Sequence, residues 1–216
     1  MKEARESWNA GEAKARWDRI AKHYGLVELI SEWYLKPFRK ILWAHAAGRV
    51  LEAGAGTGLN IAFYPPGARV TATDLSGEMM KRARERAREQ NADVTFEEAD
   101  LCKLPFADRT FDTAVATFVF CAVPDPLTCL RELARVVKPA GRILLLDHVR
   151  IDRPLIGAIM DRLNPATVLL AGEHINHRMD AFVRAAGFEV MESRKLGMMG
   201  SIQFIAAHPP GSVTSS

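Results

Sequence analysis

A glycine-rich turn after a short apolar segment constrains the fold of this chain more than any other feature. Val50 and Leu51 lead into the turn, and Gly54, Gly56 and Gly58 stand at alternate positions within it. Glycines between a strand and a helix let the backbone bend sharply and approach a ligand that a Cβ atom would push away. The sequence therefore predicts a strand that ends in a ligand-binding turn.

An acidic residue ends the next predicted strand, which covers residues 70–74. Asp74 comes 20 positions after Gly54, and Leu75 follows it. A carboxylate at the tip of the second strand of such a unit can accept hydrogen bonds from a ribose diol. The turn and the acid together predict an α/β domain that binds a nucleoside.

The spacing of the glycines and one further acid distinguish between nucleoside cofactors. The dinucleotide fingerprint places its third glycine three positions after the second, whereas Gly58 follows Gly56 after only two. Glu52 stands just inside the turn, where a carboxylate favours a ligand with an ammonium and a sulfonium over one with phosphates. Both features argue against a nicotinamide dehydrogenase.

At these residues the chain resembles the class I S-adenosylmethionine-dependent methyltransferases, whose first motif looks like Leu51-Glu-Ala-Gly-Ala-Gly-Thr-Gly58. Three further motifs follow in the expected order. The resemblance implies S-adenosylmethionine as the cofactor and S-adenosylhomocysteine as its product. It also implies a Rossmann-like seven-stranded sheet, mostly parallel with an antiparallel last strand.

The later motifs supply the remaining candidate cofactor contacts. In these methyltransferases an acid and an apolar residue after the third strand read adenine, and the matching positions here are Asp100 and Leu101. Ligands of open α/β sheets bind beyond the carboxyl ends of the strands. Thr117 and Phe118, at the end of the fourth strand, are therefore expected to face the methionine moiety.

The substrate class is indicated by three features. Residues 131–142 resemble the type 11, UbiE-like branch, which methylates small molecules, quinones and lipids. The Asn-Pro-Pro-Tyr or Asp-Pro-Pro-Tyr tetrapeptide, which holds planar amino groups of nucleic acids or glutamine, is absent after the fourth strand. Residues 59–66, residues 147–149 and the segment from 163–165 to 172–174 look like those of bacterial phospholipid N-methyltransferases and membrane-associated thiol methyltransferase-like proteins of animals.

The resemblance favours a lipid amine as the acceptor, in conversion of phosphatidylethanolamine toward phosphatidylcholine. A small thiol or a quinone-like ring is the alternative acceptor. A non-catalytic protein that binds the cofactor or a lipid surface is a third interpretation, because an intact cofactor motif does not prove turnover.

The predicted insert at residues 147–177 is expected to shape the acceptor pocket. His148 and His174 are the candidate bases, because an ammonium acceptor must lose a proton before methyl transfer. By analogy with the lipid enzymes, Tyr24 would close over the cofactor and orient the acceptor. His174 and His177, with Glu173, could instead bond structurally or bind a metal, but His-x-x-His alone is weak evidence and sulfonium chemistry needs no metal.

Composition limits the partners and the compartment. With 216 residues, 48% of them apolar, the chain suits one α/β domain with a full core. The net charge of +3 is far from a nucleic-acid-binding profile but compatible with anionic lipid. Three cysteines without CxxC spacing suggest reduced thiols in a cytoplasmic protein rather than a disulfide frame or a zinc site. Neither a signal peptide nor a membrane span is evident.

We therefore expect a cytoplasmic protein, at most peripheral at the inner membrane face, acting as a monomer or homodimer. Residues 1–46 are predicted to form N-terminal helices that cover the active site. Residues 47–208 form the predicted methyltransferase domain, and residues 209–216 a disordered tail.

The N-terminal helices have a second possible role. Aromatic residues alternate there with Lys36, Arg39 and Lys40, a composition that could lie on an anionic membrane surface. Pro37 is expected to kink or restart the second of these helices. The lid and the membrane contact are compatible with each other.

Overall fold

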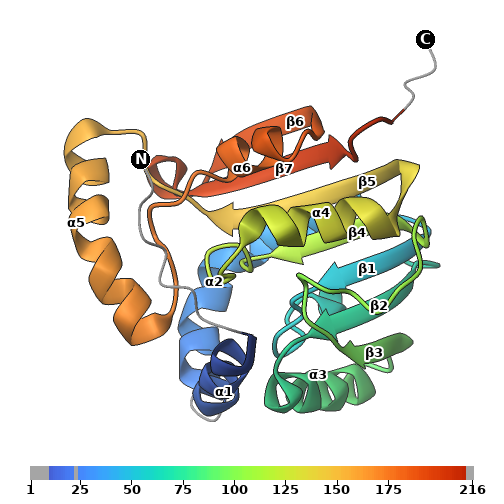
Figure 1. Cartoon of the computed structure of the whole chain (residues 1–216). Helices are drawn as coiled ribbons and strands as arrows, with labels where there is room; N and C mark the ends of the chain where they lie inside the picture. The colour runs from blue at the N-terminus through green and yellow to red at the C-terminus, as the bar shows by residue number, and fades with distance from the viewer. Residues whose placement is uncertain (1–9, 22–23, 213–216) are drawn as a thin grey trace.

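The computed structural model describes residues 10–21 and 24–212, which form a seven-stranded sheet flanked by helices (Figure 1). The strand order is β3-β2-β1-β4-β5-β7-β6, and β7 runs antiparallel to β5 and β6 while the remaining neighbours are parallel. The predicted Rossmann-like sheet is confirmed. The strands are β1 (Arg49–Ala53), β2 (Arg69–Asp74), β3 (Val94–Glu98), β4 (Phe111–Thr117), β5 (Val137–His148), β6 (Glu189–Leu196) and β7 (Ile202–His208).

Helix boundaries follow from local capping residues. The Ser76 hydroxyl accepts from the Met79 N–H at 3.2 Å and starts α3. Asp125 caps α4 in the same way, with Pro126 at the first helical position. The helices are α1 (Ala10–Ala21), α2 (Tyr24–Trp43), α3 (Gly77–Glu89), α4 (Pro126–Val136), α5 (Pro154–Ala171) and α6 (Met179–Ala185), with short 3-10 helices η1 (Ile61–Phe63) and η2 (Met198–Gly200).

The central strand β5 shows how the core is divided. Ile143 and Leu145 pack in one cluster with side chains of α4 and α6, whereas Leu144 and Leu146 pack in a second cluster with Trp43 of α2. Successive side chains of a strand point to opposite faces of the sheet. Both faces are covered by helices, which explains the unbroken apolar run in the sequence.

The strand order reverses between β1 and β4, and this switch point is where open α/β sheets bind ligands. Figure 1 shows α1 and α5 on the side toward which the arrows of β1, β4 and β5 point. The carboxyl ends of the parallel strands are therefore bordered by the N-terminal helices and by the insert.

One local prediction differs from the structure. Helix α2 continues through Pro37 instead of restarting there; Pro37 is exposed, whereas Leu42 and Trp43 of the same helix are buried. The N-terminal helices predicted over residues 1–46 are described from Ala10 onward, and residues 1–9, 22–23 and 213–216 lie outside the described residues.

The cysteine prediction is wrong in one respect. Cys102, in the loop after β3, forms a disulfide with Cys129 of α4, and Cys121 is free and buried. The two partners are 27 positions apart, and the chain fold brings them together. A spacing rule could not reveal this contact.

Thiol counting tests the disulfide. Without reductant, N-ethylmaleimide is expected to modify one cysteine of the unfolded protein, and with reductant all three. The single reactive group is Cys121, whose thiol pKa is raised by burial in the folded protein and which should therefore react slowly before unfolding. Modification of three cysteines in the unreduced, unfolded sample would contradict the disulfide.

Two glycines with the same backbone conformation test the packing of the turn on α3. Gly58 (φ +81°) has Cα of Ala83 3.0 Å from the position of an added Cβ, whereas Gly67 (φ +79°) has nothing within 4 Å. Gly67→Ala should cost about 1–2 kcal/mol for the left-handed backbone alone. Gly58→Ala should cost about 1–3 kcal/mol more because the core is overpacked. Equal losses in urea unfolding would contradict this account.

Candidate active site

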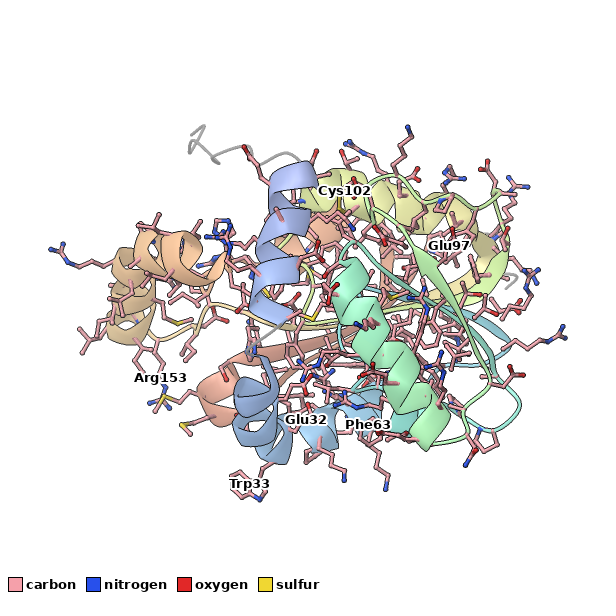
Figure 2. All side chains as sticks on the ribbon, turned by 90° about the horizontal axis from the view of Figure 1, so that it is seen from below. Glu32, Trp33, Phe63, Glu97, Cys102 and Arg153 are labelled. Atoms are coloured by element: carbon pink, nitrogen blue, oxygen red, sulfur yellow. A yellow bond between two sulfur atoms is a disulfide. The ribbon has the colours of Figure 1, made fainter. Side chains whose placement is uncertain are left out.

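A cavity of about 770 Å³ lies at the carboxyl ends of the central strands. It is bounded by the glycine turn after β1, the ends of β2 and β4, the loop after β3, and helices α1 and α2. Cys102, on the loop after β3 (Figure 2), also lines the cavity and is bonded to Cys129 of α4. The predicted site residues on its wall are Gly54, Gly56, Asp74, Leu75, Asp100, Leu101, Thr117, Phe118 and His148.

The other predicted residues are placed differently. Glu52, Gly58 and His174 are not part of the cavity wall. Gly58 instead packs on α3, as described above. Tyr24 begins α2, but its side chain lies outside the described residues.

Asp74 fastens the glycine turn to the second strand. Its carboxylate accepts from the Gly56 N–H at 2.8 Å and from the Ser76 N–H at 2.9 Å. Burial raises the pKa of the Asp74 carboxyl, and the backbone donors oppose that rise. Each carboxylate oxygen keeps a second lone pair, so the side chain could also accept from the hydroxyls of a ligand in the cavity.

Glu52 lies beneath the turn and not against the cavity. It is fully buried, with Asn60 Nδ2 donating to Oε1 at 2.6 Å and the Tyr64 hydroxyl donating to Oε2. Burial raises the pKa of Glu52, and these two hydrogen bonds work against that rise. Both oxygens of the Glu52 carboxylate accept hydrogen bonds from protein groups. The geometry therefore does not favour direct attraction of a cationic ligand by Glu52.

Arg39 of α2 is a site residue that the sequence reasoning missed. It is 7% exposed, lines the cavity, and donates from Nη1 to Asn60 Oδ1 at 2.9 Å. Its guanidinium also lies 5.2 Å from the ring centroid of Phe118. The sequence predicts Arg39 as a surface cation like Lys36 and Lys40, because burial of one of three neighbouring cations leaves no signal in composition.

Phe118 and His148 form an aromatic stack at the far end of the cavity. Their ring centroids are 4.6 Å apart with an interplanar angle of 29°. Phe118 has φ of +57°, a conformation rare for a bulky residue, and donates its N–H to the Leu146 carbonyl at 2.7 Å. Burial lowers the pKa of His148, so its imidazole is neutral at physiological pH.

The two predicted bases occupy different environments. His148 lines the cavity. The ring atom Nδ1 of His174 lies 3.2 Å from Asn164 Nδ2. The backbone N–H of His174 donates to the Cys121 carbonyl at 2.7 Å. These contacts tie the loop after α5 to the loop after β4. Among the described residues no group of three or more His, Cys, Asp or Glu side chains could hold a metal ion.

Helix α1 closes the opposite end of the cavity. Lys14 Nζ donates to the Leu75 carbonyl at 3.1 Å, and the Ser76 hydroxyl donates to Asp18 at 2.5 Å. Trp17 of the same helix is part of the cavity wall. The sequence indicates a lid here only through the helical composition of the segment.

The cavity has the features that S-adenosylmethionine requires. Its volume lies in the range of small-molecule sites. An added Cβ at Gly56 would meet nothing within 4 Å, so the backbone of the turn borders open space. Asp74, Asp100 and Leu101 line the same cavity, so two acids and an apolar side chain border it.

Comparisons with known proteins agree with this geometry. Residues 51–145 match the family model described as a methyltransferase domain. The chain is 34% identical to a phosphatidylethanolamine N-methyltransferase of Cereibacter sphaeroides, over 73% of this chain and 78% of that protein. It is 37% identical to the ubiquinone/menaquinone biosynthesis C-methyltransferase UbiE of Bdellovibrio bacteriovorus, over 60% of this chain and 57% of that protein.

A solved structure shares the fold. A SAM-dependent methyltransferase from Aquifex aeolicus superposes with a TM-score of 0.62 at 19% identity, over 94% of this chain and 99% of that one. At this identity the likeness concerns the fold alone. The sequence relatives, the matched domain and the cavity together decide the family: the chain belongs to the class I S-adenosylmethionine-dependent methyltransferases, in the type 11, UbiE-like branch.

Proposed function

We propose that this methyltransferase acts on a lipid amine and converts phosphatidylethanolamine toward phosphatidylcholine. The observation that carries the proposal is the position of Leu170 near the end of α5. Its side chain is 81% exposed and also lines the cavity. An apolar surface therefore borders the opening through which an acceptor would reach the site.

The outer surface of α5 extends this apolar border. Leu155, Ile159 and Leu163 recur every four residues and are 76%, 49% and 52% exposed, so they lie along one side of the helix. Arg153 and Arg162, both exposed, add cations to the helix. Exposed apolar surface with cations nearby suits a bilayer that contains anionic lipid.

Helix α2 supports the same proposal. Trp33 is 86% exposed and points away from the rest of the molecule (Figure 2). Lys36 and Lys40 are exposed on the same helix. Within the described residues no helix is long and apolar enough to cross a membrane. Contact by exposed side chains of α2 and α5 is the form of membrane association that we propose.

The proposed mechanism assigns positioning to the residues of this chain. When bound, S-adenosylmethionine supplies a methyl group on a sulfonium, which needs an acceptor aligned in line with the breaking bond. The glycine turn, Asp74 and Asp100 would hold the nucleoside end. Phe118 and His148 would face the acceptor, with the Phe118 ring stabilising a cationic amine. Tyr24 would close over the site.

A second candidate acceptor is a quinone-like ring or a small thiol. Similarity to the UbiE protein favours the ring, and an apolar opening would also admit a substrate with a hydrocarbon tail. Of the two predicted bases, only His148 remains a candidate contact of the acceptor in either case, because it lines the cavity and His174 does not.

Transfer of labelled methyl from S-adenosylmethionine separates these acceptors. Vesicles of phosphatidylethanolamine, with and without anionic lipid, are compared with a demethylated quinol and a small thiol. We expect label in the phospholipid, and more of it when anionic lipid is present, because the exposed cations then add to binding. Label only in the quinol or the thiol would overturn the lipid-amine proposal.

Replacement of two exposed leucines of α5 by aspartate tests membrane contact. Leu155→Asp with Leu163→Asp should lower vesicle binding and turnover on vesicles at least about tenfold, since both apolar burial and attraction to anionic lipid are lost. Turnover of a water-soluble, short-chain phosphatidylethanolamine should be unchanged. Met191→Asp, at a 52% exposed apolar residue of β6, is the matched control. Equal loss on both substrates would contradict membrane contact through α5.

A further inference from the structure

The segment after α5 holds an acidic residue rigidly at the cavity wall. Gly172 ends α5 with φ of +76°, and its N–H donates to the carbonyls of Thr167 and Val168. The Thr167 hydroxyl donates to the Glu173 carbonyl at 3.0 Å, and the next residue bonds to the Cys121 carbonyl. The backbone on both sides of Glu173 is thus bonded to neighbouring segments, which keeps this residue at the cavity wall.

The carboxyl of Glu173 has no stabilising partner among residues 10–21 and 24–212. It lines the cavity, and it makes no hydrogen bond or ion pair there. Burial, with the negative charge of Asp147 nearby, raises the pKa of Glu173 to about 7. Asp147 is itself satisfied by the N–H groups of Phe120, Cys121 and His148. A largely buried acid without a partner costs stability unless a cation or a donor meets it.

The groups around Glu173 leave the cationic role to a ligand. The Cys121 thiol behind it has a pKa raised by burial, then by Asp147 and Glu173, so it stays neutral. His148 is neutral, and His177 has Nε2 4.0 Å from Asp147. Arg39 bonds to Asn60 and Glu32. Arg16 donates to the Leu169 carbonyl.

We propose that Glu173 is the catalytic carboxylate that receives a cationic amine acceptor beside Phe118 and His148 and takes its proton. This inference rests on the lipid-amine function and identifies the base that such a function needs. One N–H bond of the ammonium breaks as an O–H bond forms on Glu173. The free amine then forms the N–C bond, the C–S bond of the sulfonium breaks, and its electron pair stays on the departing neutral sulfur. The acid returns its proton to water.

The chemistry at Glu173 suits this step better than that at His148. A general base works best when its pKa is close to the working pH, which burial provides for Glu173 and removes from His148. A carboxylate also attracts the ammonium before it accepts the proton, whereas a neutral imidazole does not.

The first test compares Glu173→Gln with Glu89→Gln, a control at an exposed position of α3. With phosphatidylethanolamine in mixed micelles at pH 8, Glu173→Gln should lower kcat/KM roughly 10²-fold or more. Its affinity for S-adenosylmethionine, measured by calorimetry, should stay within about twofold of the wild type, since the acid meets the acceptor and not the cofactor. The control should match the wild type.

Two results would overturn the inference while leaving the proposed function intact. One is a wild type that methylates the amine and a Glu173→Gln variant that does so equally well. The other is a fall in cofactor affinity that accounts for the whole loss of kcat/KM, which would place Glu173 against the methionine ammonium. A wild type that methylates no amine would instead end the proposed function, and the inference with it.

Binding of glycerophosphocholine in the presence of S-adenosylhomocysteine provides a readout without turnover, because its phosphodiester keeps one charge between pH 6 and pH 8. Glu173 loses its proton as the pH rises through about 7, so the quaternary cation should bind the wild type more tightly at pH 8 than at pH 6. Glu173→Gln should bind it weakly and without this pH dependence. A pH dependence that persists in Glu173→Gln would assign the effect to another group and overturn the inference.

Thermal unfolding checks that the variant is folded and that the acid is buried. The pKa of Glu173 is raised in the folded state from 4.5 to about 7, so its protonated form is favoured by folding. The contribution of protonated Glu173 to the stability of the fold is fully present below about pH 4.5 and is lost as the pH rises through about 7. Relative to the wild type, Glu173→Gln should therefore gain more in Tm at pH 8.5 than at pH 5. An equal change at both would contradict the raised pKa.

Discussion

The buried carboxylate of Glu52 is the constraint on which the rest of the site depends. It lies in β1 with no exposed surface, and Asn60 and Tyr64 donate to its two oxygens. Because an unbonded buried acid would be costly, both donors are held in place, and they follow directly after the glycine turn. Asn60 in turn accepts from Arg39 of α2. One buried group thereby fixes the turn and attaches the N-terminal helix to it.

This attachment makes the N-terminal helices part of the site and not a separate cover. Arg39 reaches the Phe118 ring after β4, while Lys14 and Asp18 of α1 bond to Leu75 and Ser76 after β2. Each helix therefore contributes to a different part of the cavity wall.

The cavity divides into an end built by the sheet and an end built by the insert. The sheet edge supplies the turn and the acids that suit a nucleoside, features that the methyltransferase fold shares. Helix α5 and the loop after it supply Leu170 and Glu173. Relatives that are named for a lipid amine and for a quinone resemble this chain to similar degrees. Under the proposed function, the choice of acceptor would rest on side chains added to a common fold.

The sequence by itself determined the sheet, the glycine turn and the positions of Asp74, Asp100, Thr117 and Phe118 on one cavity, because turn geometry and strand ends are local properties. It did not determine that Glu52 faces Asn60 and Tyr64, that Arg39 is buried, or that Cys102 meets Cys129. It also placed His174 and His148 together as bases, although only His148 lines the cavity, and it gave Glu173 no catalytic role. These outcomes depend on which distant segments pack against each other. Burial then sets the charge state of each group, and only the tertiary structure decides burial.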